Sequence, residues 1–304
     1  MSAVATPLRR RLAEGSALPV VVVVLAILAI WYVAAIPMNW QTTVDRLARA
    51  GTAATFAETV GETWSAERPV LPAPHQIVGE IWKTTVTVKP SSPRSLLFHA
   101  GVTLSSTLLG FAIGTLLGIL LAVGIIGSRT LDRSLMPWLI ASQTIPILAV
   151  APMVIVVLNS VGIQGLFPKA VISTYLSFFP VAVGVLRGLE TPDRIHLDLM
   201  RSYAASYGQT LRSLRFPAAV PHLLPALRLA AASAVVGAVV AEVSIGMRGG
   251  IGRMLIQLAG QGSSDPAAPW GPVFGSIALG LIAVGSVALV GLGLKNYRRG
   301  EATA

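Results

Sequence analysis

Polar side chains inside the apolar stretches of this sequence are few, and they are the residues that could bind a polar solute. Glu242 is the only acidic residue well inside an apolar run, within VVGAVVAEVSIG. An ionisable or polar group is costly in an apolar medium, so such residues are candidates for function. For Glu242 three positions stay open: lining a pathway, bridging two copies of the chain, or reaching an outer interface. The full set of candidates is Gln143, Thr144, Asn159, Ser173, Tyr175, Ser177 and Glu242.

The sequence carries no arrangement typical of an enzyme or a metal site. It has no cysteine, which excludes thiolate metal ligands and a cysteine nucleophile. None of its lysines follows a glycine, so the phosphate-binding motif G-x-x-x-x-G-K-[S/T] is absent, and so is the zinc motif H-E-x-x-H. We therefore expect a chain that is not itself an enzyme and that binds no metal and no cofactor.

A polar, basic loop over residues 187–221 has its own signals for helices. Thr191 is a good N-cap and Pro192 suits the first helical position, so a helix is predicted from there to about Tyr203. Ser206 and Gln209 form a capping box that predicts a second helix directly afterwards. An apolar side on such a helix needs a cover, which is a protein partner or, alternatively, the lipid surface. Three prolines at four-residue spacing should bend the entry into the next apolar segment: Pro217, Pro221 and Pro225.

Membrane-spanning helices would position these residues. Of the 304 residues, 54% are hydrophobic and only 12% are charged, whereas soluble domains are about 25% charged. A run of about 20 apolar residues can span a bilayer as a helix. Six such runs occur, at 18–36, 100–126, 136–158, 168–186, 223–245 and 272–294. The predicted fold class is an all-α integral membrane protein with about six transmembrane helices.

The distribution of Lys and Arg predicts the direction of the crossings. Thirteen of the 23 basic residues lie in short flanks and loops on one side, which the positive-inside rule places in the cytoplasm. The termini, residues 1–17 and 295–304, and the loop 187–221 are then all cytoplasmic. Because the net charge of +10 lies largely beside apolar segments, nucleic acid is not an expected partner.

The part of the chain before residue 100 leaves two questions open. Three arginines before the run at 18–36 are typical of a signal peptide, but the run is longer than a signal core, so an anchored helix is favoured over cleavage. In the outer segment 37–99, residues 72–87 predict an amphipathic helix at the interface. Residues 39–68 are either an added hairpin or a disordered insert.

Small residues and prolines indicate how the remaining range, 100–294, forms a five-helix core. Gly110, Gly114 and Gly118 recur at four-residue spacing, which lets helices approach closely in lipid. Several prolines in the third run should kink it, so that it lines something rather than serving only as an anchor: Pro137, Pro146 and Pro152.

The loop resembles the EAA loop of permease subunits in bacterial ABC importers, whose pattern is Glu-Ala-Ala, three residues, Gly, nine residues, Ile, two residues and Pro. The spacing places Asp198, Leu199 and Met200 on Glu-Ala-Ala, Ala204 on Gly, Leu214 on Ile, and Pro217 on Pro. If the corner requires a positive φ at the glycine position, Ala204 is strained there.

The resemblance covers about residues 72–297. Four segments are similar to parts of the sulfonate, taurine, nitrate and pyrimidine-precursor permeases. They are LPAPHQIVGEIW, HAGVTLSSTLLGFAIGTLLGILLAVGIIGS, MPWLIASQTIPILAVAPMVIVVLNSVG and PALRLAAASAVVGAVVAEV. The resemblance implies a type I ABC importer transmembrane domain in the bacterial cytoplasmic (inner) membrane. Its substrate would be a small solute of one of these types, and membrane lipid would surround it.

The resemblance also implies partners. A second copy would complete the pathway, two cytoplasmic ATPase subunits would bind ATP and Mg, and an extracytoplasmic binding protein would deliver the solute. An ion-gradient-driven secondary transporter and a membrane scaffold without a pathway remain alternatives. The implied ATPase-coupling residues are Ile195, Asp198, Leu199, Met200, Arg201, Tyr203, Ala204, Ala205, Ser206, Leu214 and Pro217.

Overall fold

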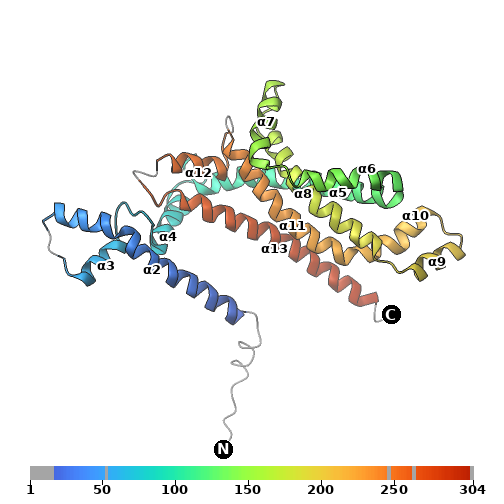
Figure 1. The fold of residues 1–304 in the computed structure, drawn as a ribbon, viewed down its shortest axis with the longest axis horizontal. Helices are drawn as coiled ribbons and strands as arrows, with labels where there is room; N and C mark the ends of the chain where they lie inside the picture. Colours follow the sequence, from blue (N-terminus) through green and yellow to red (C-terminus); the bar gives the residue numbers. More distant parts are fainter. Residues whose placement is uncertain (1–16, 52–53, 245–247, 262–264, 302–304) are drawn as a thin grey trace, which may run out of the picture. The chain divides into compact units, whose positions relative to one another are not determined.

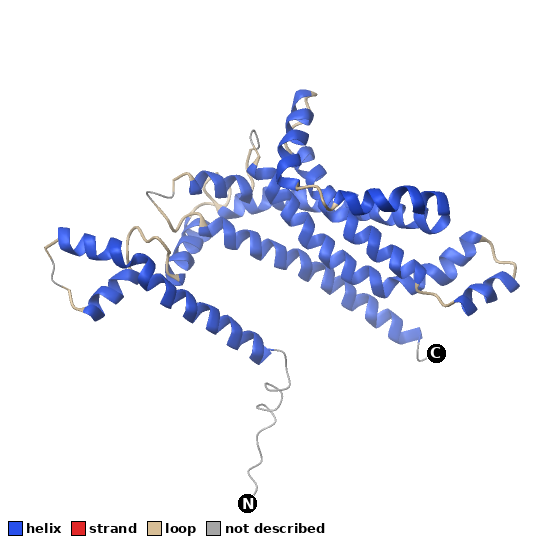
Figure 2. Ribbon diagram, viewed as in Figure 1, coloured by secondary structure: helices blue, strands red, loops and turns tan. Residues whose placement is uncertain are grey.

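The structure is a computed structural model that describes residues 17–51, 54–244, 248–261 and 265–301. The arginines before the first apolar run lie outside the described residues. Over the described ranges the chain forms helices and loops without a strand (Figure 2), which confirms the all-α prediction. The chain divides into two compact units, Met1–Thr87 with Leu258–Gly271 and Val88–Gln257 with Pro272–Ala304.

The first unit contains a helical hairpin followed by a short helix. Helix α2, Ala17–Arg49, runs through Pro37 and continues well beyond the apolar run. Helix α3, Phe56–Trp64, packs against it. Residues 39–68 are therefore a hairpin wherever the structure describes them. A helix also forms within the predicted interfacial segment, as α4, Pro74–Trp82, with a π-helical turn over Lys83–Thr87.

Asn39 ties the hairpin together. Its fully buried side chain donates from Nδ2 to the carbonyls of Thr63 (3.1 Å) and Leu71 (2.8 Å), and its Oδ1 accepts the amide of Leu71 (3.0 Å). A capping box of Thr55 and Glu58 starts α3, and the hydrogen bonds from the Thr55 backbone and side chain lower the pKa of the Glu58 carboxyl. Asn39, which lies just after the apolar run, thus holds the hairpin to the segment that follows α3.

Three long helices form the core of the second unit and lie side by side in Figure 1. They approach closely because small residues face one another. A Cβ added at Gly110 would lie 2.4 Å from Cβ of Ser173, and one at Gly118 would lie 2.7 Å from the carbonyl oxygen of Phe178. The predicted packing role of these glycines is confirmed. The helices are α5, Leu96–Gly127, α8, Leu166–Glu190, and α11, Phe216–Val243.

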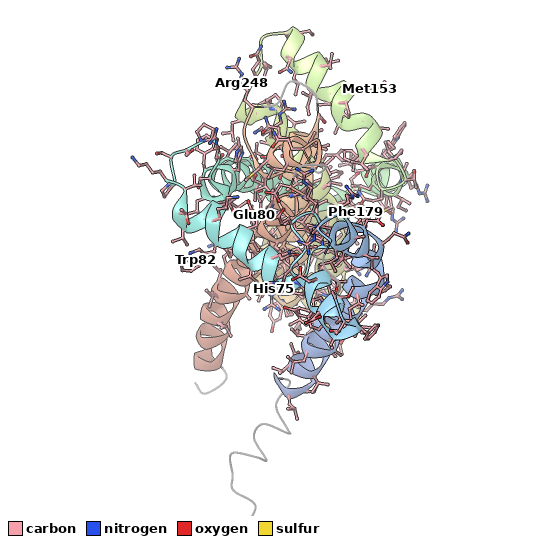
Figure 3. The ribbon with its side chains drawn as sticks, turned by 90° about the vertical axis from the view of Figure 1, so that its left-hand side faces the viewer. His75, Glu80, Trp82, Met153, Phe179 and Arg248 are labelled. Carbon is pink, nitrogen blue, oxygen red and sulfur yellow. The ribbon has the colours of Figure 1, made fainter. Side chains whose placement is uncertain are left out.

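The predicted crossing at 136–158 is not one helix. It is replaced by α6, Arg129–Ser142, and α7, Ile147–Ser160, which meet at an angle of 102°. Pro146 lacks an N–H, so the carbonyl four residues earlier, that of Ser142, cannot be paired within a continuous helix. α7 projects from the bundle in Figure 1, and Met153 lies on its outer surface (Figure 3), 70% exposed.

Two further helices follow, and most of the residues of each belong to the second unit. Helix α12, Ile251–Ala259, follows α11, and α13, Trp270–Glu301, extends the predicted last crossing through most of the predicted tail. Within the described residues, five helices are long and apolar enough to cross a membrane, and six spans result if α6 and α7 together make one. The prediction of about six crossings therefore holds.

Candidate functional site

The loop between α8 and α11 forms two short helices separated by a tight corner, as predicted (Figure 1). They are α9, Arg194–Ser202, and α10, Tyr207–Thr210, which leads through a π-helical turn, Leu211–Arg215, into α11. The predicted N-cap at Thr191 is wrong: α9 begins two residues later, with Asp193 as its N-cap. Thr191 instead ends α8 as its C-cap, because its backbone is still helical, and its hydroxyl donates to the carbonyl of Arg187 (3.0 Å).

The corner is a Schellman motif centred on Ala204. Its φ is +52°, the one positive value of a non-glycine residue in the described part of the chain. The amide of Ala205 donates to the carbonyl of Met200 (3.0 Å), and the amide of Ala204 donates to that of Arg201 (2.9 Å). The left-handed conformation strains an L-residue other than glycine or asparagine. The position aligned with the family's glycine thus needs the conformation that glycine adopts most easily.

The capping box predicted for the second helix is confirmed. The Ser206 hydroxyl accepts the amide of Gln209 (3.3 Å), and the Gln209 side-chain oxygen accepts the amide of Ser206 (2.7 Å). The corner is therefore fixed on both sides, by the Schellman motif that ends α9 and by the capping box that starts α10.

An apolar stripe of three exposed residues runs along α9. Ile195, Leu199 and Tyr203 are 74%, 52% and 78% exposed and recur at four-residue spacing, so they share one helix face. Asp198 and Arg201 form an exposed ion pair beside the stripe (2.9 Å). Exposed pairs of this kind contribute little to stability. The stripe is the apolar surface of the loop that nothing in the described chain covers.

The two ends of the loop are fastened to the long helices. Arg215 Nη1 donates to the carbonyl of Leu189, the next-to-last residue of α8 (2.8 Å). Thr191 Oγ1 and His222 Nε2 lie 3.1 Å apart and connect the end of α8 to α11. Close by, a Cβ at Gly188 would lie 2.7 Å from Cα of Ala219. The predicted loop residues Leu214 and Pro217 lie in this fastened region.

Three of the predicted pathway residues meet at the break between α6 and α7. The Tyr175 hydroxyl, from α8, donates to the carbonyl of Ser142, which is the carbonyl that Pro146 leaves without a helical partner. Gln143 and Thr144 form the break itself and are exposed. We call Gln143, Thr144 and Tyr175 the break cluster. Their amide and hydroxyl groups can donate and accept hydrogen bonds without carrying charge.

The other predicted pathway residues lie elsewhere. Asn159 is at the far end of α7, and its Oδ1 is buried without a hydrogen-bond partner. Ser177 is fully buried between α5 and α8, where its hydroxyl donates to the carbonyl of Gly110 (3.3 Å). Ser173 is likewise buried and donates to the carbonyl of Ala234 (2.8 Å). Both serines hold helices together in the described chain.

The side chain of Glu242 is fully buried within the single chain. Oε2 accepts hydrogen bonds from the hydroxyl of Thr103 (2.8 Å) and the amide of Gly252 (3.1 Å), and Oε1 lies 3.6 Å from Nζ of Lys169. The amide of Ile251 donates in turn to Thr103 Oγ1 (2.8 Å). The carboxylate thereby joins α5, α8, α11 and the start of α12.

Lys169 is a residue of this cluster that the sequence did not single out as a candidate. It is 2% exposed and donates to the carbonyls of Arg248 (3.0 Å) and Gly249 (2.9 Å). The signal was present, because a single acidic residue in an apolar run requires a partner. The described residues contain no group of side chains arranged to hold a metal ion.

Comparisons with known proteins agree with this architecture. Residues 114–297 match the family described as binding-protein-dependent transport system inner membrane component. The chain is 33% identical over 202 residues to a formylaminopyrimidine transport permease of Halalkalibacterium halodurans, covering 65% of this chain and 76% of the relative. It is 31% identical over 186 residues to a riboflavin transport system permease of Chloroflexus aurantiacus, covering 61% and 65%. It is 28% identical over 193 residues to a putative aliphatic sulfonates transport permease of Bacillus subtilis, covering 60% and 68%.

Proposed function

Because the chain belongs to the family of binding-protein-dependent transport system inner membrane components, we propose that its α9 couples the transport pathway to a separate ATPase subunit. The protein is a multi-pass inner membrane permease subunit of an ABC import system, with the type I permease fold. The proposal adds the contact through which ATP hydrolysis drives the movement. ATP and Mg would be bound by the ATPase subunits and not by this chain.

The apolar stripe of α9 carries the proposal. Ile195, Leu199 and Tyr203 form a surface that would be stabilised by lying in an apolar groove of another protein, as amphipathic helices commonly do. The exposed charges of Asp198 and Arg201 beside it would set the register of the contact. Met200, Ala204, Ala205 and Ser206 would act by holding the stripe in place.

The fastened ends of the loop would carry its movement into the membrane. When two ATPase subunits close on ATP, α9 would move with the groove that holds it. Arg215 and His222 would transmit this displacement to α8 and α11, and α5 would follow because it is closely packed against α8. A tilt of these helices would switch the pathway between inward-open and outward-open states.

The broken crossing supports pairing with a second copy of the chain. α6 and α7 have 14 residues each, or about 21 Å of helix, which is less than the hydrocarbon thickness of about 30 Å. Free backbone groups at such a break are tolerated in a membrane where they are covered by protein or line a cavity. A homodimer would cover the break and place two break clusters around one pathway.

The break cluster favours an uncharged, hydrogen-bonding solute. Gln143, Thr144 and Tyr175 offer neutral donors and acceptors. Two of the relatives named above are permeases for heteroaromatic compounds, formylaminopyrimidine and riboflavin. We infer a small heteroaromatic solute, such as a vitamin or its precursor, delivered by an extracytoplasmic binding protein.

Both termini and the α9 loop would face the cytoplasm, where the ATPase lies. The direct test of the function is uptake by proteoliposomes that contain the chain with or without its ATPase and binding protein. Uptake that requires all three and ATP supports the proposal. Uptake by this chain alone, driven by an ion gradient, would overturn it.

A further inference from the structure

The hairpin of the first unit holds a pocket that the proposed transport cycle does not use. Its volume is about 380 Å³, within the usual range of ligand sites. The hairpin precedes residues 114–297, which match the family, so the pocket is an addition to the shared core. The lining residues come from the end of α2 and the segment after α3: Thr42, Thr43, Arg46, Arg49, Ala66, Glu67 and Arg68.

The charges around the pocket suit an anion. Arg46 forms an ion pair with Glu62. Arg49 and Arg68 form no ion pair in the part of the chain that the structure describes, so both guanidinium groups have free donors. Glu67 offsets one of these charges, and an excess of positive charge remains. Guanidinium groups bind carboxylate, sulfonate and phosphate oxygens in pairs of parallel hydrogen bonds, which makes an oxyanion the matching ligand.

The position of the pocket along α2 indicates where the anion comes from. The apolar run ends at Ile36, and Arg46 lies ten residues further along the same helix, a rise of about 15 Å. The headgroup layer on each side of a bilayer is only about 5–8 Å thick. A tilt of about 20° shortens the rise by only about 1 Å. The arginines thus stand beyond the lipid headgroups, in the aqueous phase.

From these observations we propose that the pocket formed by the end of α2 and the segment after α3 is a binding site for a small dissolved oxyanion, held through a carboxylate, sulfonate or phosphate group by Arg49 and Arg68. The site is separate from the break cluster, and its occupancy does not depend on the coupling through α9.

Calorimetric titration of the full chain in nanodiscs of uncharged phosphatidylcholine tests the proposal, with succinate and inorganic phosphate as probes at constant ionic strength. We expect saturable binding of at least one probe, with one site per chain. Arg49→Gln and Arg68→Gln should each weaken binding at least tenfold. Arg94→Gln, which alters an exposed arginine of the second unit, is the control and should leave the affinity unchanged. No saturable binding, or equal affinity in all three variants, would overturn the proposal.

Nanodiscs that contain phosphatidylglycerol test the alternative source of the anion. If the soluble probes fail to bind while the anionic lipid raises the unfolding temperature of the wild type but not of Arg49→Gln and Arg68→Gln, the ligand is a lipid headgroup and the proposal is wrong. If the probes bind in both lipid compositions with similar affinity, the dissolved anion is supported.

Discussion

The ammonium group of Lys169 lies 3.6 Å from the carboxylate of Glu242, and both side chains are enclosed in the helical core. Lys169 stands near the start of α8 and Glu242 near the end of α11, at the end of the bundle opposite the α9 loop. The lysine also holds the carbonyls of Arg248 and Gly249. The pair therefore fastens the segment after α11 to α8, as Arg215 and His222 fasten the other end.

Glu242→Gln should destabilise the protein strongly. The substitution keeps the shape and leaves the Lys169 ammonium without its counter-charge, which costs about 3–5 kcal/mol for a buried pair. The double variant Lys169→Met with Glu242→Gln removes both charges and should recover much of this loss. Thermal unfolding in detergent, analysed as a double-mutant cycle, measures the coupling. Additive effects of the two single substitutions would show that the pair does not act as a unit.

Gly118→Val should separate α5 from α8. A Cβ there would lie 2.7 Å from the backbone oxygen of Phe178, which cannot move without shifting the helix. Overpacking of this kind typically costs about 1–3 kcal/mol. Gly101→Val is the matched control on the same helix, because a Cβ there meets nothing within 4 Å. Unfolding temperatures of the two variants are compared, and equal values would contradict the close contact.

Ala204→Gly should stabilise the corner of the α9 loop. The left-handed conformation at Ala204 costs an L-residue about 1 kcal/mol that glycine does not lose, although glycine also has more freedom in the unfolded state. Ala204→Val should have the opposite effect because its branched Cβ fits this conformation worse. Hydrogen exchange of the α9 amides reports the change: slower exchange in the glycine variant and faster exchange in the valine variant. The reverse order would exclude a positive φ at this position.

Pro146→Ala should impair transport without lowering stability. Alanine restores an N–H that can pair with the carbonyl of Ser142, so α6 and α7 can join into a straighter helix. The Tyr175 hydroxyl then loses its acceptor, and the break cluster loses its arrangement. We expect uptake to fall at least tenfold while the unfolding temperature stays the same or rises. Full uptake by this variant would show that the break is not needed.

Local sequence patterns predicted the helices and several of their caps and contacts. They did not predict which residues far apart in the chain would pair. The capping box of Ser206 and Gln209 and the packing of Gly110 and Gly118 depend on short spacings, so the sequence displays them directly. The choice of Asp193 over Thr191 as N-cap was not predictable, because it depends on how far the preceding helix extends, and Thr191 still belongs to the end of α8.

Other features depend on residues far apart in the chain. Pro146 was visible as a kink, but at the bend of 102° the carbonyl of Ser142 accepts a hydrogen bond from the hydroxyl of Tyr175, which lies on another helix. Glu242 was visible as a costly residue, but its partner Lys169 stands near the start of another helix, far away in the sequence. The extension of α2 beyond Ile36 depends on Asn39, whose partners are two segments that follow much later.

If the apolar stripe of α9 couples the membrane core to an ATPase, a charge placed in the stripe should break the coupling. This can be measured as ATP hydrolysis by the complete complex in proteoliposomes, stimulated by the solute-loaded binding protein. Tyr203→Asp places a charge in the stripe, and His196→Asp places the same charge at an exposed position of α9 outside it. We expect Tyr203→Asp to insert normally but to lose the stimulation, whereas His196→Asp keeps it. Full stimulation with Tyr203→Asp, or equal loss in both variants, would show that the stripe does not couple the two proteins.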